Sequence, residues 1–200
     1  MGRTFDAPET VQGKGTYLKL PGTYHFAVNR IVDGEGPKGG VITGFTMFLS
    51  VLAGTVEGQK ELEYTMVLFD PDLSGSEKAQ AWARKKQAAA FIALGLMNPA
   101  DLGKPGLSIP DLSTADGTQL IAKLAIDDYN DTPRLELSYA DIWHIDDPRA
   151  KAFPKDESAF EFLPDGFRKK EEWFAPLVSK KGGGSKSKPS RLSEDDLDDL

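Results

Sequence analysis

Alternating hydrophobic and polar positions mark three strands in the first third of the chain. The alternation is strongest at 23–32, resumes over 41–55 after a glycine-rich loop, and returns at 62–69. A period of two residues is typical of a sheet that has one buried and one exposed face. We therefore predict a meander of three strands.

The second predicted strand carries an aromatic residue on its polar side. Its inward positions are hydrophobic, namely Phe45, Met47, Leu49 and Val51. Thr46, Phe48 and Ser50 alternate with them, which predicts that all three lie on the exposed face. Phe48 is therefore the first candidate for a ring that contacts a ligand.

A helical period follows the third strand. Ser74 and Glu77 have the spacing of a capping box, in which both side chains satisfy free amides of the first turn. Alanine-rich sequence then predicts one helix over 76–95. Its buried face is expected to hold Ala83, Gln87, Ala90, Phe91 and Leu94.

Two more strands are expected after a break rich in proline and glycine at 98–110. They cover 119–127 and 134–144, and the residues at 128–131 favour a turn between them. Three strands, a helix and a hairpin fit a five-stranded OB-type barrel, in which the helix between strands 3 and 4 plugs one end and an open face binds oligonucleotides. We predict this mainly β (α+β) fold over 16–148, although other small barrels fit the same order of elements.

The flanking segments differ from the predicted barrel in composition. Residues 1–15 are polar and glycine-containing, which predicts a flexible arm. Residues 149–179 hold too many aromatic side chains for a linker, so we expect a C-terminal aromatic extension packed on the barrel. Residues 180–193 are predicted to form a flexible basic linker, and 194–200 an acidic tail.

Composition narrows the chemistry. The chain has no cysteine, which excludes thiolate catalysis, and its two histidines are too few for an ordinary catalytic zinc site unless carboxylates complete it. We therefore expect no metal and no cofactor. No apolar run reaches the length of a membrane span, and the amino terminus lacks a signal region. We expect a protein that is cytoplasmic, in a bacterial cell or a phage-infected host, and that binds no membrane.

Charge is segregated along the chain. The net charge is −7, of which the last seven residues carry −5, so residues 1–193 carry only −2. A nearly neutral body can bind phosphates when its cations gather on one face. The tail consists of Glu194, Asp195, Asp196, Leu197, Asp198, Asp199 and Leu200.

The acidic tail predicts a partner with basic side chains around a small apolar pocket. Five carboxylates and two leucines bury too little apolar surface to fold alone, which is typical of an interaction tail. Bacterial and phage single-stranded DNA-binding proteins often end in this way. The alternative interpretation is a solubilising tail.

Several short motifs together resemble a known family. They are Leu20-Pro21-Gly22-Thr23-Tyr24, the glycine-rich loop at 34–40, the alanine-rich helix, and Asp128-Tyr129-Asn130-Asp131-Thr132-Pro133-Arg134. Over 16–145 the chain resembles small OB-fold proteins of phages and prophages, once catalogued as a domain of unknown function and similar to single-stranded DNA-binding proteins. The resemblance implies a binder without a reaction of its own. The chain departs from the family pattern in its insertion after the helix and in its aromatic extension.

Binding of single strands requires aromatic faces for the bases and cations for the phosphates. Phe48, Tyr129, Trp143 and Phe69 are the stacking candidates, and for Trp143 and Phe69 the alternative is packing in the core. The candidate cations are Arg30, Lys38, Lys123 and Arg134, each of which could equally be a solvated surface charge. These residues do not distinguish DNA from RNA.

Catalytic interpretations have weaker support. The pairs Asp127-Asp128, Asp146-Asp147 and Asp70-Pro71-Asp72 could serve a two-metal nuclease, but turn formation explains them more simply. The glycine-rich segments lack the spacing of a P-loop. We therefore expect no enzyme.

The sequence predicts a protein that coats single-stranded DNA and uses its tail in two ways. Without DNA the tail is expected to occupy the basic DNA-binding groove, and with DNA bound it would recruit replication or recombination proteins. Exposed strand edges also favour a homo-oligomer. The main alternative is an OB-fold adaptor or inhibitor of other proteins, with a solubilising or DNA-mimicking tail.

Overall fold

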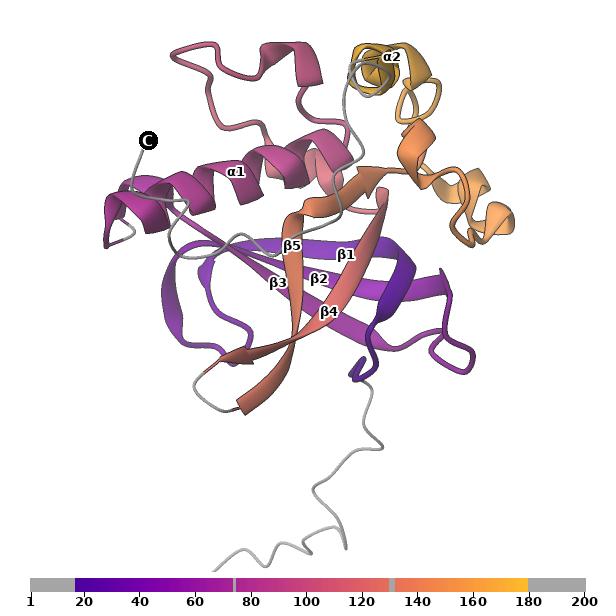
Figure 1. Cartoon of the computed structure of the whole chain (residues 1–200), viewed down its shortest axis with the longest axis horizontal. Coiled ribbons are helices and arrows are strands. Elements are labelled where there is room, and N and C mark those ends of the chain that lie inside the picture. The colour runs from indigo at the N-terminus through magenta and orange to yellow at the C-terminus, as the bar shows by residue number, and fades with distance from the viewer. Residues whose placement is uncertain (1–16, 74, 130–131, 180–200) are drawn as a thin grey trace, which may run out of the picture.

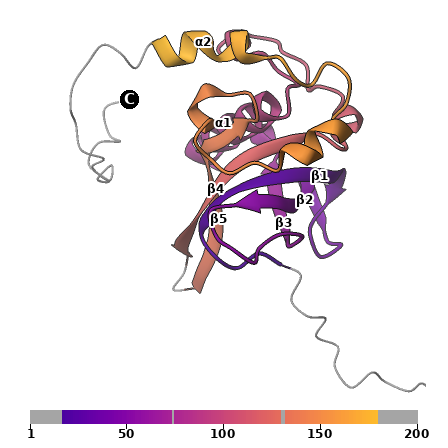
Figure 2. The same ribbon diagram turned by 90° about the vertical axis from the view of Figure 1, so that its right-hand side faces the viewer.

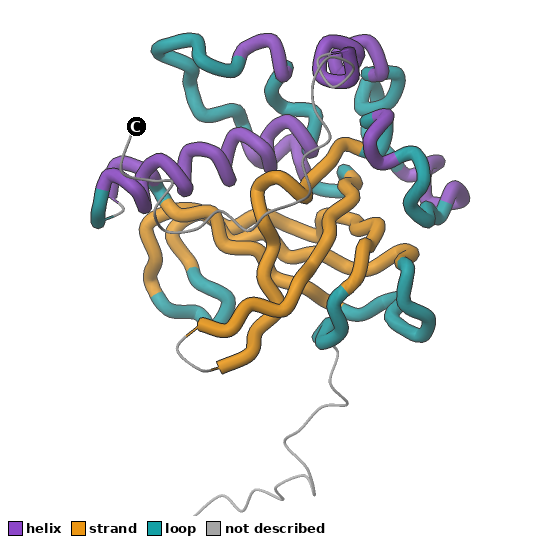
Figure 3. Tube along the Cα trace, in the orientation of Figure 1, coloured by secondary structure: helices purple, strands orange, loops and turns teal. Residues whose placement is uncertain are grey.

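The computed structural model describes residues 17–73, 75–129 and 132–179 and has a mainly β fold (Figures 1 and 3). Within these ranges the strands are β1 (Gly22–Glu35), β2 (Val41–Gly54), β3 (Glu63–Phe69), β4 (Gln119–Tyr129) and β5 (Thr132–His144). The helices are α1 (Glu77–Ala93) and α2 (Glu171–Ser179), with 3₁₀ turns η1 (Pro71–Leu73), η2 (Pro99–Asp101), η3 (Leu112–Ala115), η4 (Pro148–Ala150) and η5 (Glu157–Phe162). The prediction of a mainly β fold with five strands is confirmed.

All five strands belong to one antiparallel sheet in the order β3-β2-β1-β4-β5. β1 lies in the centre because it pairs with β2 along one edge and with β4 along the other. The sheet is strongly curved, as Figure 2 shows, and its two edge strands line a common cavity. We call this gap between β3 and β5 the seam.

The main core lies inside the curve of the sheet. Alternate residues of the first three strands fill it, including Phe26, Met47, Leu49, Met66 and Leu68, all at most 1% exposed. α1 lies across one end of the strands (Figure 1), and its predicted inner face is buried. A run of helix formers with small and apolar side chains on one face therefore closes the core.

The helix begins later than its capping signal predicted. Ser76 is the N-cap, and its hydroxyl accepts a hydrogen bond from the amide of Ala79 at 3.3 Å. Ser74 lies outside the described residues. Within the described chain, no helix combines the length and the apolar character needed to cross a membrane.

A second apolar cluster covers part of the outer surface of the sheet. Residues of the segment after β5 pack on Ile121 of β4 and Trp143 of β5. The members from this segment are Ile145, Ala150, Phe153, Phe160, Leu163 and Phe167. The aromatic residues that follow the hairpin therefore contact the sheet, and they cover its β4 and β5 side.

Two strand ends differ from the prediction. β1 continues to Glu35, into the expected glycine-rich loop, because the hydroxyl of Thr46 donates a hydrogen bond to the Glu35 carbonyl. Thr46 is consequently 0% exposed, which corrects its predicted place on the open face. β4 and β5 extend to Tyr129 and Thr132, so the joint between them is shorter than expected.

Candidate nucleic-acid interface

An aromatic ring and a guanidinium are stacked on the outer face of β1 and β2. The register places Arg30 opposite Phe48, and the guanidinium carbon lies 4.3 Å from the ring centroid. A register shift after Val28 leaves Asn29 outside the pairing, which turns Arg30 onto the face of Phe48. Phe48 is partly exposed and Arg30 is exposed, so the pair presents an ordered cation and a ring to the surface.

The exposed face continues from Phe48 towards the seam. Thr65 of β3 lies opposite Phe48 in the sheet register and also lines the seam cavity, whose volume is about 430 Å³. Arg134 and Glu136 of β5 line the other side of this cavity. Phe48, Thr65 and Arg134 therefore follow one path across β2, β3 and the seam.

α1 adds an aromatic ring and a cation to the seam. Lys86 is 9% exposed and its ammonium lies 4.7 Å from the ring centroid of Trp82, one helical turn away. Burial lowers the pKa of Lys86, while the nearby Glu136 carboxylate opposes this effect. Burial also raises the pKa of Tyr64, on the β3 side, to about 12. Neither Trp82 nor Lys86 was predicted as a site residue, and the basic run at 84–86 was the one signal in the sequence for Lys86.

Arg134 is held by two acidic side chains. Its guanidinium lies 3.5 Å from a carboxylate oxygen of Asp127 and 3.2 Å from one of Glu136. All three side chains are substantially exposed, so these ion pairs are weak and solvent-screened. A phosphate could compete with either carboxylate for the same guanidinium.

Two predicted cations lie away from the Phe48 and Arg30 pair. Lys38 is exposed in the turn between β1 and β2. Lys123 is exposed on β4 opposite Thr23, which is seven positions from Arg30 along β1, or about 23 Å at the rise of a strand. The structure therefore does not bring Lys123 to the ring, and a ligand would have to extend along β1 to touch both.

Two of the predicted stacking residues differ in exposure, one buried and one exposed. Trp143 is 9% exposed and its ring packs on Phe153 at 5.3 Å between centroids, which corrects the expectation that it is free to stack on a base. Phe69, for which core packing was the alternative, is 46% exposed. The side chain of Tyr129 and the tail residues 194–200 lie outside the described residues.

Both histidines lie between the sheet and the segment after β5. His25 accepts a hydrogen bond from the amide of Asp156 through Nδ1, at 3.1 Å, and its Nε2 lies 3.0 Å from the amide oxygen of Gln119. His144 Nδ1 accepts from the amide of Asp146 at 3.0 Å, and its Nε2 is buried with no hydrogen-bond partner among the residues that the structure describes. Burial lowers the pKa of each imidazole to about 4. Both rings are therefore neutral at pH 7.

The predicted carboxylate pairs have structural partners where they are described. Asp146 binds the guanidinium of Arg168 at 2.8 Å, and Asp147 binds that of Arg149 at 2.5 Å. Asp147 also caps η4, as turn formation predicts. Asp70 accepts a hydrogen bond from the amide of Asp72 at 2.9 Å. These contacts favour a structural interpretation of Asp146-Asp147 and of Asp70-Pro71-Asp72.

Comparison with known proteins adds no relative. No protein-family model matches the chain, and no curated protein is found to be similar to it. The function is therefore inferred from the residues and their geometry.

Proposed function

We propose that this chain is a single-stranded DNA-binding protein built on an OB-type barrel, which binds without sequence specificity. The observation that carries the proposal is the stacked pair of Arg30 and Phe48 on the uncovered part of the sheet. The protein has no reaction of its own in this proposal. It acts in replication or recombination, in the cytoplasm of a bacterial or phage-infected cell, and its acidic tail recruits partner proteins.

The strand order supports the OB-type barrel. A central β1 that pairs with β2 and β4, and edge strands β3 and β5 that meet at the seam, fit a five-stranded, partly open barrel. In such barrels the face of the second and third strands and the turns between strands 1 and 2 and between strands 4 and 5 bind oligonucleotides. Phe48 and Thr65 lie on this face, Lys38 lies in the turn between β1 and β2, and Arg134 lies on β5, two residues after its start.

The coverage of the sheet supports the same face. The second apolar cluster occupies the outer side of β4 and β5, whereas Phe48 and Thr65 on β2 and β3 are partly exposed. A base can stack on the open side of the Phe48 ring while a phosphate binds the Arg30 guanidinium. The bases are read by shape alone, because an aromatic face accepts any of them.

Removing the ring tests the proposal most directly. Phe48→Ala is expected to weaken binding of fluorescein-labelled oligo-dT by roughly 5-fold to 100-fold, since one stacked base contributes about 1–3 kcal/mol. Fluorescence anisotropy measures the affinity, and thermal melting shows whether the variant is folded. Phe162→Ala is the matched control, because Phe162 is 74% exposed in η5, outside the proposed path. Equal losses in both variants, or no loss in Phe48→Ala, would contradict the proposed face.

The salt dependence of binding tests the role of Arg30. Arg30→Gln is expected to make the slope of log affinity against log salt shallower by about 0.7, the value for one phosphate contact on a single strand. Titrations at several salt concentrations measure the slope. Lys151→Gln should leave the slope unchanged, because Lys151 is an exposed cation in the segment after β5, outside the proposed path. A duplex of equal length should bind more weakly than oligo-dT. If the chain binds neither nucleic acid, the adaptor interpretation is favoured instead.

A further inference from the structure

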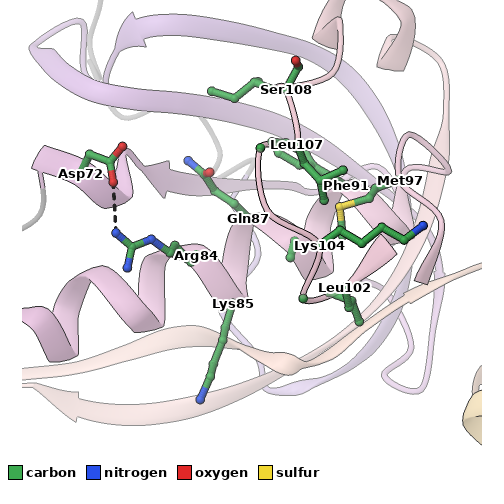
Figure 4. A pocket seen from close by; sticks show the side chains of 14 residues that line it. Asp72, Arg84, Lys85, Gln87, Phe91, Met97, Leu102, Lys104, Leu107 and Ser108 are labelled. Atoms are coloured by element: carbon green, nitrogen blue, oxygen red, sulfur yellow. Dashed lines mark hydrogen bonds and ion pairs between the residues drawn. The ribbon is translucent and has the colours of Figure 1, made fainter. Parts of the chain in front are cut away.

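A groove separate from the proposed DNA path runs between α1 and the segment at 98–110. Its volume is about 670 Å³, and Figure 4 shows Phe91, Met97 and Leu107 grouped inside it. Phe91 belongs to the inner face of α1, whereas Leu107 comes from the segment above the helix. We call this hollow the α1 groove. Neither Phe48 nor Arg30 lines it.

The segment above α1 exposes apolar side chains that a folded domain usually buries. Leu102, Leu107 and Ile109 are 52%, 49% and 59% exposed, and all three line the α1 groove. Large apolar side chains that gather around a hollow mark an interaction site more often than isolated ones do. The groove therefore fits a ligand with a few aliphatic side chains.

Two basic side chains flank this apolar centre. Figure 4 shows Arg84 and Lys104 on opposite sides of the apolar group. Lys85 also lines the groove, but it points away from the apolar group, and its ammonium lies 5.7 Å from the ring centroid of Tyr139 on β5. Arg84 is paired with Asp72 at 3.1 Å and Lys104 with Asp101 at 2.6 Å, and the side chains of both cations are more than half exposed. Such surface ion pairs contribute little to stability, so carboxylates of a ligand can replace or share them.

We propose that the α1 groove binds residues 194–200 of this same chain. The tail carries five carboxylates and two leucines, which match the basic rim and the apolar centre. Leu197 and Leu200 are three residues apart, a spacing that puts both side chains on one face of a helical turn. Leu197 and Leu200 enter the groove, and the carboxylates bind Arg84 and Lys104.

The starting point of the tail favours binding within one chain. α2 ends at Ser179 and packs against η2, which begins the segment that lines the groove. Figures 1 and 2 show α2 and that segment at the same end of the molecule. Residues 180–193 span up to about 45 Å when extended, and a tether of this kind gives an effective concentration in the millimolar range.

Docking in the α1 groove changes the expected role of the tail. The sequence predicted that the tail competes with DNA for one basic face, whereas this site lies on α1 and is lined by neither Phe48 nor Arg30. The tail is then withheld from partner proteins by the protein's own groove, whether or not DNA is bound. The inference does not rest on DNA binding, so either proposal can fail without the other.

Engineered disulfides test the site, because the natural chain has no cysteine. Ser193→Cys next to the tail is combined with Ser108→Cys at the groove, with Ser50→Cys beside Phe48, or with Ser158→Cys in η5. Under mild oxidation the Ser108 pair is expected to close about 10-fold faster than the other two, because docking raises the concentration of the tail at Ser108 above the millimolar level that the tether alone gives to all three pairs. Gel mobility separates a closed monomer from a dimer.

Further substitutions identify the contacts. Leu197→Ser with Leu200→Ser, or Arg84→Glu with Lys104→Glu, should reduce closure of the Ser108 pair to the rate of the Ser158 pair. Lys78→Glu with Lys151→Glu makes the same change of charge at exposed positions that do not line the groove and should have no effect. Equal rates for all three pairs, fastest closure at Ser50, or a product that is mainly a dimer would each overturn the proposal. A product that is mainly a dimer would assign the groove to the tail of a second copy of the chain.

Discussion

Replacing Gly44 by alanine is expected to lower the free energy of unfolding by about 3 kcal/mol or more. A Cβ atom at this position of β2 would lie 2.1 Å from the carbonyl oxygen of Leu68 and 2.8 Å from Cα of Phe69. Both are backbone atoms of β3, so no side chain can rotate to make room. Gly44 also has a φ of +133°, which L side chains rarely adopt.

Substitutions at two other glycines separate the effect of the steric clash from that of the backbone strain. A methyl group added at Gly40 would meet no atom within 4 Å, and the φ of this residue is ordinary, so Gly40→Ala should change stability little. Gly117 has a φ of +78° and equally open space, so Gly117→Ala measures backbone strain without a clash. Thermal melting should place Gly44→Ala lowest, with a Tm about 10 °C below that of the natural chain. A Tm equal to that of Gly117→Ala would show that β3 does not lie this close to β2.

The close approach at Gly44 also concerns the proposed interface. Gly44 pairs with Phe69 at the end of β3, and Thr65 of the same strand forms part of the path from Phe48 to the seam. Displacing β3 would change the width of the seam. We therefore expect Gly44→Ala to weaken binding of oligo-dT even at temperatures where the variant is folded.

The sequence alone predicted the strands well because they depend on a local pattern. The alternation over 41–55 correctly placed Met47, Leu49 and Val51 inside, and the helical period correctly identified the face of α1 that holds Ala90 and Phe91. These assignments require only that the buried face repeats every two residues in a strand or every three to four in a helix.

What covers the outside of the sheet could not be read from the same pattern. Trp143 is buried by Phe153 of the segment that follows β5, and Thr46 is buried because it bonds to the Glu35 carbonyl across a hairpin. The alternation correctly places both residues on the outer face of their strands. Whether that face is exposed, however, depends on other parts of the chain that pack on it. The α1 groove has the same origin, since α1 and the segment at 98–110 form it only when they come together.

The pairing of Arg30 with Phe48 was predictable in kind but not in geometry. Both were named as candidates because a ring on a polar face and a cation on the neighbouring strand suit a nucleic acid. Their contact depends on the register shift after Val28, for which the residues 28–30 give no sequence signal. Without that shift Arg30 would point to the other face of β1.

The largest effect of pH is expected between pH 6.5 and 4, from the two buried histidines. The pKa of each is about 4 in the folded protein and 6.5 as its ordinary value, so the folded state binds fewer protons than the unfolded state in this range. Stability is therefore complete above pH 6.5 and falls as the pH falls towards 4. Each histidine accounts for up to about 3 kcal/mol at the acidic end.

The neighbours of each ring explain the direction. Burial is the main cause for both, and Lys155 near His25 and Lys170 near His144 further disfavour a second positive charge. Asp156 and Asp146 oppose this effect without overcoming it. Protonation of Nδ1 also removes the acceptor for the amide of Asp156 or Asp146, which loosens the segment after β5 from the sheet.

Urea unfolding at pH 7, 6, 5 and 4.5 measures the loss, and the NMR signals of the two imidazoles report each pKa directly. His144→Phe should remove about half of the pH dependence in this range, because phenylalanine can stack between Phe167 and Phe174 without titrating. Asp156 is distinguishable from the histidines, since interactions with Ser158 and Lys60 lower the pKa of its carboxyl to about 2 and move its effect to more acidic solution. Equal stability at pH 7 and pH 5, or imidazole signals that titrate near 6.5, would show that the segment after β5 does not enclose the two rings.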